Sequence, residues 1–320
     1  AKLQPGAYRV TSGGVTRDVN VAIGSGTAVS FAVEDANRVV VRGYRSAIDV
    51  SSVESNTVFT QEQIQALPVT RDVNAVATLA PGVVKGDPDL GAGNLPAFSG
   101  ASVAENGYYI NGFDVTNIRN FLSYSSLPFD AIGAQQVKSG GYGAEFGRSL
   151  GGVVSLVTKR GTNTWKGGGA VYWEPSGFAA HSDDIVDLNG DSKYAVYQSA
   201  NKRKQLSYNV YAGGPIVEDK LFIFALIEGR DNKNDTFGND SSTRSTSTIP
   251  QGMVKIDFTP NDMHRLEFTG ISNKRETDII DYRTNPITPY PVRHLGVGEK
   301  STIEGGGHTL IGKYTGYLTD

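Results

Sequence analysis

The chain of 320 residues lacks the groups that several common kinds of functional site require. It has no cysteine, which excludes disulfides, thiolate metal sites and cysteine nucleophiles. A formal net charge of −3 gives no electrostatic basis for binding nucleic acid. The longest strongly apolar run, residues 221–227, is far shorter than the roughly 20 residues of a membrane-spanning helix. Strands remain compatible with a membrane, because a barrel strand turns only alternate residues toward lipid.

Glycine and tyrosine are abundant, with 39 and 15 residues, whereas methionine occurs only twice. This composition is typical of barrels with tight turns and aromatic girdles, although a soluble β protein can share it. The four histidines are scattered along the chain and form no H-E-x-x-H motif. We therefore predict no cofactor and no catalytic residue.

The second half of the chain reads as amphipathic strands joined by alternately long and short connections. In a membrane barrel, long loops lie on one face and tight turns on the other. A soluble sandwich gives no reason for this alternation, and it stays the alternative. The six predicted strands cover residues 167–174, 204–214, 220–231, 251–258, 263–272 and 308–318.

The strand at residues 204–214 shows the predicted two-residue period most clearly. Leu206, Tyr208 and Val210 fall on one face, whereas Ser207 and Asn209 fall on the other. The strand at residues 251–258 alternates in the same way. We therefore expect one apolar and one polar face.

The first half contains two helix signals. Thr60 and Gln63 form a capping-box pattern, and the helix that follows should end at Leu67 before a proline. Thr70 is expected to cap a second helix, which the pair at 81–82 (Pro-Gly) should stop.

Turn and strand signals fill the rest of this half. Asn111-Gly112 is a strong hairpin signal. Residues 85–102 lack periodicity and are predicted to form a loop, as are residues 120–129. Strands are expected at 135–139 and 153–159.

Three stretches together resemble the plug domain of TonB-dependent outer-membrane receptors. They are YGAEFGRSLGGVVSLVTKRGTN (142–163), YYINGFDVTN (108–117) and QALPVTRDVNAVATLAPGV (65–83). LQPGAYRVTSGG (3–14) resembles the closing strands of a carboxypeptidase-regulatory-like β-sandwich, which points to the Oar-like branch. The resemblance implies a mainly β fold with a small α/β plug, enclosed by the N-terminal strands of a 22-stranded transmembrane β-barrel.

The expected domain order follows from these matches. Residues 1–35 would end the regulatory-like sandwich, 36–46 would be a TonB-box-like linker or first plug strand, 47–163 the plug, and 164–320 the first six barrel strands. Six strands cannot close around a plug, and open edges in lipid cost several kcal/mol per unpaired group. We therefore expect the chain to be cut at both ends, with several hundred residues after Asp320.

The resemblance implies a non-enzymatic function. This is TonB-dependent active transport of a ligand across the Gram-negative outer membrane, energised by the inner-membrane proton gradient. The implied partners are the TonB–ExbB–ExbD complex, outer-membrane lipid, other outer-membrane proteins and an unknown ligand, such as a peptide or protein. The alternative is an outer-membrane adhesion or secretion-related interaction protein with the same plug and barrel.

A short apolar segment between arginines could pair with a strand of TonB, because an exposed strand edge accepts another strand. The alternative is that this segment is the first plug strand. The residues concerned are Arg38, Val39, Val40, Val41 and Arg42.

Other site candidates lie in plug loops and carry two expected roles. Phe98, Phe121 and Tyr124 could contact a ligand, or pack the plug against the barrel wall. Glu145 and Arg148 lie three residues apart in the EFGR motif. The resemblance implies that this pair clamps plug to barrel; the alternative is a solvated surface pair worth about 0–1 kcal/mol.

Two further motifs have simpler explanations. Residues 147–151 match G-x-S-x-G, but a predicted strand follows, where the hydrolase elbow requires a helix. An acidic loop suggests an irregular calcium site, although EF-hand spacing fails at Ser192 and Gln198. A solvated acidic surface is the alternative there. The candidate calcium ligands are Asp183, Asp187, Asn189 and Asp191.

Overall fold

The structure, a computed structural model, forms two compact units. Unit 1 comprises residues 1–125 and 132–159, and unit 2 comprises residues 126–131 and 160–320. The described residues are 6–12, 15–21, 54–91, 93–180, 182–186, 194–238, 241–261, 263–283 and 293–317.

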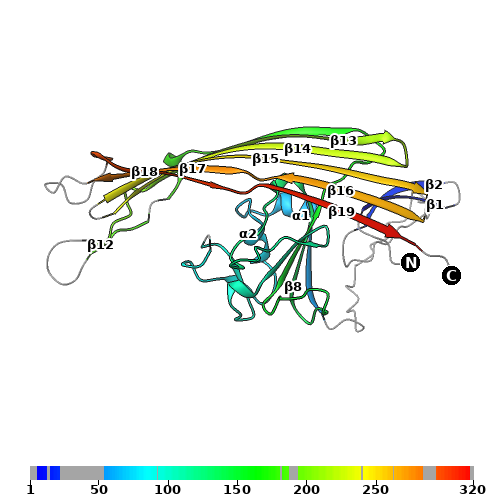
Figure 1. The fold of residues 1–320 in the computed structure, drawn as a ribbon, viewed down its shortest axis with the longest axis horizontal. Coiled ribbons are helices and arrows are strands. Elements are labelled where there is room, and N and C mark those ends of the chain that lie inside the picture. Colours follow the sequence, from blue (N-terminus) through cyan, green and yellow to red (C-terminus); the bar gives the residue numbers. More distant parts are fainter. Residues whose placement is uncertain are drawn as a thin grey trace, which may run out of the picture. The chain divides into compact units, whose positions relative to one another are not determined.

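Unit 1 contains an N-terminal hairpin and a mixed five-stranded sheet (Figure 1). The sheet order is β3-β8-β9-β6-β7, and β6 runs parallel to β9 while the other neighbours are antiparallel. Within the described part of the chain, no helix is both long enough and apolar enough to cross a membrane. The elements are β1 (Gly6–Ser12), β2 (Val15–Val21), β3 (Ser55–Thr60), α1 (Gln61–Ala66), α2 (Val73–Ala77), β4 (Val83–Lys85), β5 (Pro96–Phe98), η1 (Val103–Glu105), β6 (Gly107–Ile110), β7 (Phe113–Asp114), β8 (Ile132–Gly140) and β9 (Val153–Thr158).

The two short helices have different caps. The capping box at α1 is confirmed: the Gln63 N–H donates to Thr60 Oγ1 over 3.4 Å, and the Thr60 N–H donates to Gln63 Oε1 over 2.9 Å. The predicted cap of α2 at Thr70 was wrong. The helix begins later, and Asp72 Oδ1 accepts the Asn74 N–H at 3.4 Å. A turn from the Asp72 N–H to the Thr70 carbonyl, 2.7 Å long, displaces the start of the helix.

A two-stranded sheet of β4 and β5 lies within residues predicted to form a loop. Val83 pairs with Phe98 in this ladder, and the Phe98 side chain is fully buried. Strands of three residues are too short to show a hydrophobic period, so sequence analysis did not detect them. The core of unit 1 also contains Val76, Ala77, Ile110, Ile132, Val137, Val153 and Val154.

The predicted Asn111-Gly112 hairpin is confirmed. Asn111 and Gly112 have φ values of 52° and 86°, so both occupy the left-handed region that a two-residue turn of type I′ requires. Asn111 Oδ1 also accepts the Thr158 N–H at 3.0 Å, which ties the turn to the end of β9.

Unit 2 contains an eight-stranded antiparallel sheet (Figure 1). Six of its strands follow the order β10-β13-β14-β15-β16-β19, and they correspond to the six predicted strands. The elements of unit 2 are η2 (Phe129–Ala131), β10 (Lys166–Glu174), η3 (Ser176–Phe178), β11 (Ile185–Val186), β12 (Tyr194–Val196), β13 (Lys202–Val217), β14 (Leu221–Phe237), β15 (Ser241–Asn261), β16 (His264–Ser272), β17 (Arg275–Arg283), β18 (Val297–Gly305) and β19 (His308–Gly316).

Residues 232–247 and 273–305 were expected to form long loops, but the described residues of both stretches largely form strands. The ladder between β14 and β15 continues to the pair Phe237 and Ser242, and β17 pairs with both β15 and β18. These extensions are rich in Ser, Thr, Asp and Glu, and β18 is largely exposed. Without a buried apolar face, the extensions have no hydrophobic alternation to reveal them.

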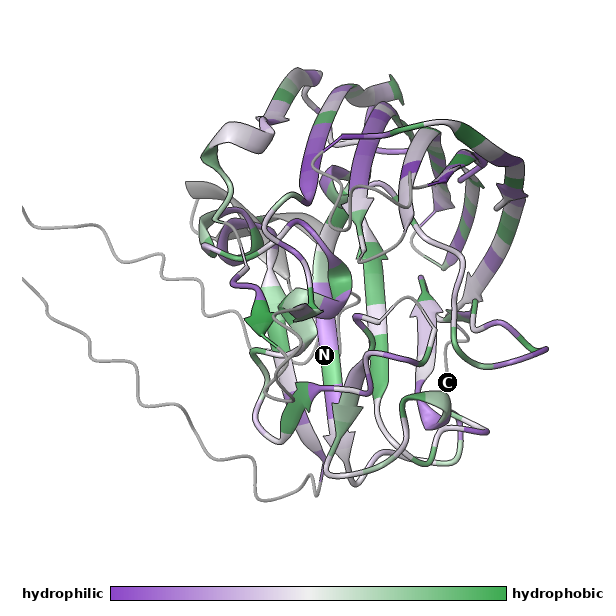
Figure 2. Cartoon of the chain, turned by 90° about the vertical axis from the view of Figure 1, so that its left-hand side faces the viewer, coloured by the Kyte–Doolittle hydropathy of each residue, from purple (hydrophilic) through white to green (hydrophobic). Residues whose placement is uncertain are grey.

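Register aligns the apolar side chains of neighbouring strands in the six-stranded part of the sheet. Val171 lies opposite Tyr208, Val210 opposite Ile227, and Gly270 opposite both Val254 and Leu310. Figure 2 shows the resulting hydrophobic bands along the strands. These side chains lie on the exposed face: Val171 is 71% exposed, Val254 41% and Leu310 69%. The predicted facing of these strands is confirmed.

The opposite face of the same strands is largely buried and mixes apolar side chains, such as Leu226, Met253 and Ile271, with many polar ones. Asp257 lies directly opposite Glu267 in the ladder between β15 and β16, where two like charges would repel. Arg265 Nη2 lies 3.1 Å from a carboxylate oxygen of each, and Lys255 Nζ lies 3.3 Å from Glu267 Oε1. Other buried polar side chains of these strands are those of Ser207, Asn209, Glu228, Gln251 and Thr269.

Gly152 is required by close packing in unit 1, which makes it a test of that core. A Cβ there would overlap the ring of the fully buried Phe98. We expect Gly152→Ala to destabilise unit 1 by about 1–3 kcal/mol, the range for overpacking. Hydrogen–deuterium exchange of peptides covering β5 and β9 measures this. Gly147→Ala is the matched control, because a Cβ at that position meets open space; equal exchange in both variants would contradict the packing argument.

Candidate functional site

Three loops of unit 1 meet at one end of its sheet. Because β6 and β9 are parallel, with Gly107 opposite Val153, both strands begin at the same end. The loops that precede them, residues 99–106 and 141–152, therefore lie at that end. The loop after β7, residues 115–125, joins them because β7 runs antiparallel to β6.

The loop at 141–152 is held by hydrogen bonds to its own backbone and to the loop before β6. The Tyr142 hydroxyl lies 3.1 Å from the Gly151 carbonyl and 3.1 Å from Ser149 Oγ. The backbone N–H groups of Leu150 and Gly151 both donate to the Glu105 carbonyl over 3.0 Å. The loop is therefore ordered by hydrogen bonds, although it is rich in glycine.

Asn106 joins these two loops to β5. Its Nδ2 donates to the Pro96 carbonyl over 2.7 Å, and its Oδ1 accepts the Gly152 N–H at 3.3 Å. The side chain is only 3% exposed, so both bonds satisfy groups that are shielded from water. Asn106 is a positioning residue of this end of the sheet.

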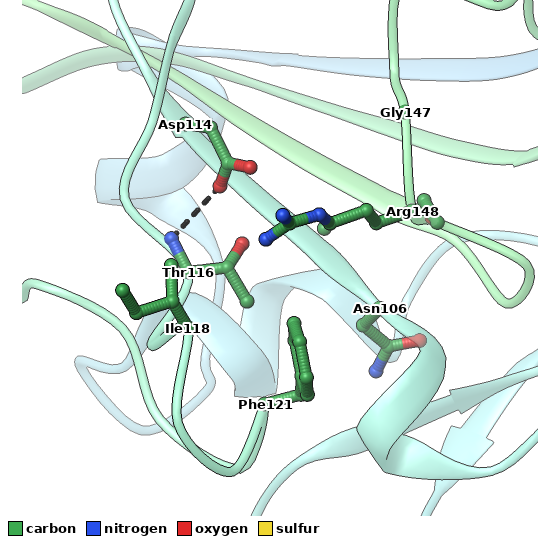
Figure 3. Close-up of a pocket in the computed structure, with 9 residues that line it drawn as sticks. Asn106, Asp114, Thr116, Ile118, Phe121, Gly147 and Arg148 are labelled. Carbon is green, nitrogen blue, oxygen red and sulfur yellow. Dashed lines mark hydrogen bonds between the residues drawn. The ribbon is translucent and has the colours of Figure 1, made fainter.

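The loop after β7 supplies the facing wall (Figure 3). Asp114 Oδ1 accepts the Thr116 N–H at 2.9 Å, and Thr116 Oγ1 accepts the Tyr108 N–H at 2.9 Å. These two bonds fix the Asp114 carboxylate and the Thr116 side chain at the start of β6. Sequence analysis missed Asn106, Asp114 and Thr116, although D-x-T is a pattern that forms Asx turns.

Between the loops lies a small pocket that is open to solvent. Arg148 and Phe121 reach it from opposite loops with φ values of 67° and 58°, a backbone region that bulky residues rarely adopt. In Figure 3 the Arg148 side chain points toward Asp114 and Thr116. The pocket is lined by Asn106, Gly107, Asp114, Thr116, Ile118, Phe121, Gly147, Arg148 and Ser149.

The chemistry of the pocket suits a polar ligand that also has an apolar part. Arg148 offers a cation with up to five N–H donors, Asp114 a carboxylate, and Phe121 an aromatic surface. Backbone strain at Arg148 and Phe121 is consistent with a binding role, because such strain clusters at functional sites.

The structure brings together two of the predicted site residues and separates others. Phe121 and Arg148 share the pocket, whereas Glu145 is exposed and does not line it. Among the described residues, no ion pair links Glu145 to Arg148. Phe98 is fully buried beside Gly152 and offers no surface to a ligand, so we remove it from the ligand contacts.

Tyr124 packs within unit 1. Its ring stacks on that of the buried Tyr108 with centroids 4.0 Å apart and planes inclined by 11°. The Tyr108 hydroxyl lies 3.3 Å from Asn74 Oδ1. Burial raises the pKa of both phenols well above the ordinary value, and the nearby Asp72 raises each further. Tyr124 therefore packs on Tyr108 inside unit 1, whereas the two predicted roles were contact with a ligand and packing against the barrel wall.

Ser149, the central residue of the G-x-S-x-G match, has a structural role. Its Oγ lies 2.9 Å from the Gly152 carbonyl and 3.3 Å from the Glu105 carbonyl. Strand β9 follows it, as expected, where a hydrolase elbow would place a helix.

The remaining predicted sites lie largely outside the described residues. This applies to the proposed TonB-pairing segment, residues 38–42, and to Asp187, Asn189 and Asp191 of the calcium candidate. Asp183 is exposed, and the neighbouring Asp184 accepts the backbone N–H groups of Gln198 and Ser199 at 2.7 and 2.8 Å. In the part of the chain that the structure describes, no three His, Asp or Glu side chains could jointly hold a metal ion.

Comparisons with known proteins agree with this architecture. Residues 48–153 match the family model of the TonB-dependent receptor plug domain. The TonB-dependent transporter Oar of Myxococcus xanthus is 28% identical over 197 residues, which cover 58% of this chain and 18% of that protein. The outer membrane transporter YddB of Escherichia coli has a similar structure, with a TM-score of 0.53, 17% identity, and coverage of 72% of this chain and 37% of that one.

The matched region, residues 48–153, contains the strands from β3 to β8 and all the residues that line the pocket. Residues 48–153 are thus similar to the TonB-dependent receptor plug domain. The chain spans less than a fifth of the Oar transporter and about a third of the YddB structure. The YddB likeness supports the fold alone, and the predicted total of 22 strands stays a prediction.

The stacked tyrosines predict sensitivity of unit 1 to alkali. A phenol whose pKa is raised in the folded state contributes stability that is fully present below its unfolded pKa of about 10 and lost as pH rises through the folded value. We expect unit 1 to lose stability above about pH 10, and Tyr124→Phe to reduce that loss while keeping the stack. Hydrogen exchange of β6 and β9 against pH measures the effect. Tyr317→Phe, at a tyrosine 47% exposed, is the control; an identical response in both variants would refute the assignment.

Proposed function

We propose that this chain belongs to a transporter that moves a ligand across the Gram-negative outer membrane. Residues 164–320 would begin the barrel wall and residues 47–163 would form its plug, after a regulatory-like domain at 1–35 and a linker at 36–46. The wall would close with on the order of 22 strands, the size that encloses a folded domain. The protein would carry out no covalent chemistry.

The register-aligned apolar face of unit 2 is the observation that carries the proposal. Outward side chains from six consecutive strands form one apolar surface, while the same strands bury charged and amide groups on the other face. A water-soluble sheet rarely exposes so continuous an apolar surface, because burial in water favours apolar groups. Lipid is the environment that suits such an exposed apolar surface.

Energy for transport would come from the inner-membrane proton gradient through the TonB–ExbB–ExbD complex. The proposed contact with TonB is the segment Arg38–Arg42, whose central valines favour an extended strand. Addition of a strand requires free backbone N–H and C=O groups along that segment.

The ligand would contact the plug at the pocket of Arg148 and Phe121. The combination of cation, carboxylate and aromatic ring suits a peptide or a protein loop, because either can offer charged and apolar side chains. Glu145 and Arg148 retain their proposed role as a clamp between plug and barrel in the ligand-free state.

The lipid-facing role of the apolar surface makes a direct prediction for the full-length protein. Val254 lies in the middle of that surface, so Val254→Arg should destabilise the membrane-inserted barrel by about 2–4 kcal/mol. Urea titration of folding into lipid vesicles measures this change. Ile303→Arg is the matched control, because Ile303 is 51% exposed on β18 in the extension. Equal effects of the two changes would argue against lipid contact at Val254.

Strand addition by TonB makes a second prediction. Val40→Pro removes a backbone donor and should abolish binding of the TonB C-terminal domain, whereas Val40→Ala keeps the donor and should bind as the native protein does. Binding is measured by calorimetry with the full-length receptor in detergent. In cells, the Val40→Pro receptor should retain ligand detectable by native mass spectrometry, as should the native receptor in a TonB-deficient strain.

Other results would support the alternative function. If the amounts of receptor-bound and cell-associated ligand change neither when TonB is removed nor with Val40→Pro, the protein is an adhesion or secretion-related interaction protein. Recovery of the whole protein in the soluble fraction without detergent would overturn both membrane functions.

A further inference from the structure

Six residues of the plug sequence belong structurally to the barrel sheet. Residues 126–131 are part of unit 2, although residues 54–125 before them and 132–159 after them belong to unit 1. The segment reads SLPFDA and ends in the short helix η2. Its place in unit 2 depends on contacts made across long stretches of sequence.

Three polar side chains of the sheet hold the segment from separate places. Asn209 Nδ2, on β13, donates to Asp130 Oδ2. Gln251 Nε2, on β15, donates to Ser126 Oγ over 3.4 Å. Asn273 Nδ2, just after β16, donates to the Ser126 carbonyl over 3.1 Å. The sequence separations of these bonds are 79, 125 and 147 residues, so they are tertiary contacts and not loop geometry.

Apolar burial adds to these bonds. Leu127 is 6% exposed, Phe129 7% and Ala131 0%, and Pro128 is also buried. Burying a leucine or phenylalanine side chain fully is worth about 1.5–3 kcal/mol. A segment that combines two such side chains with hydrogen bonds at both ends resists removal more than a solvated loop would.

The position of the segment in the chain determines which residues this resistance protects when the chain is pulled. A force applied before residue 54 first loads the ladder between β3 and β8. Once β3 has separated from β8, the force runs along residues 61–125, where β6 must leave β9, and then reaches the segment 126–131. If the segment holds at that point, β8 and β9 lie beyond the load. Residues 54–125 can then be drawn out while residues 132–159 stay in place.

We propose that residues 126–131 are a mechanical anchor that remains on the sheet of unit 2 while residues 54–125 are pulled out of the plug. The inference rests on the proposed function for its biological use, because TonB would supply the force. The physical claim concerns the chain alone: the anchor divides the plug into a part that yields and a part that stays.

The test is single-molecule force spectroscopy on the full-length receptor in a lipid bilayer. The described chain has no native cysteine, so Ala36→Cys provides one covalent pulling point in it. This handle bypasses TonB, which keeps the test valid if the proposed function fails. The roughly 70 residues from Glu54 to Ser125 should extend by about 250 Å before a stop, whereas release through Lys159 would extend by about 370 Å.

Two changes should affect the stop in opposite ways, one making it rarer and the other making it permanent. Asn209→Ala removes the donor to Asp130 and should at least halve the fraction of traces that stop at about 250 Å, with the rest running to about 370 Å. Asp130→Cys with Asn209→Cys, joined by a short reducible thiol crosslinker, should make the stop permanent until the crosslink is reduced. The matched control is Asn201→Ala, which removes a bond from the Phe237 N–H in unit 2 and should leave the stop unchanged.

Each outcome decides the matter. A native trace without a stop, or equal traces for Asn209→Ala and Asn201→Ala, would overturn the anchor. A stop that the crosslink does not make permanent would do the same. Force can also be applied through a probe tip that carries the TonB C-terminal domain. If the stop behaves as expected when force is applied through the Ala36→Cys handle, but this tip never attaches to the receptor, the anchor stands and the proposed function fails.

Discussion

The two-residue period of the strands in unit 2 is the constraint on which the rest of the sheet depends. Along β13 it places Val210 on the exposed apolar face and Asn209 on the buried face. Register then carries this division across neighbours, so that Val210 meets Ile227 and Asn209 meets Glu228. No local propensity could produce a surface spanning six strands; it exists because each strand alternates and each ladder is in phase.

Unit 1 is stabilised in a different way, because it has few long strands and a small core. Its sheet is completed by side chains that replace missing backbone partners. Asn106 bonds Pro96 and Gly152, Asn111 bonds Thr158, and Thr116 accepts the Tyr108 N–H. These polar side chains fix the loops at one end of the sheet, and the pocket exists because those loops are fixed.

The sequence predicted the features that repeat and missed those that do not. Alternation along residues 204–214 and 251–258 identified the strands and their faces, and the Thr60 capping box and Asn111-Gly112 turn were visible as local motifs. The extensions of β14 and β15 were missed because their exposed faces are polar and leave no alternation. The pairing of β4 with β5 and the role of Asn106 depend on residues far apart in sequence, for which a single chain offers no signal.

The contacts of the segment 126–131 and the exposed apolar face of unit 2 are set by the same register. Asn209 and Gln251 reach the segment 126–131 because they occupy buried-face positions of β13 and β15. A slip of one residue in either ladder would turn these side chains to the apolar face and bury the neighbouring apolar ones. Under the proposed function, a sheet that turns its apolar face to lipid would also present the groups that hold the anchor. Selection for that facing alone would then preserve the contacts of the segment 126–131.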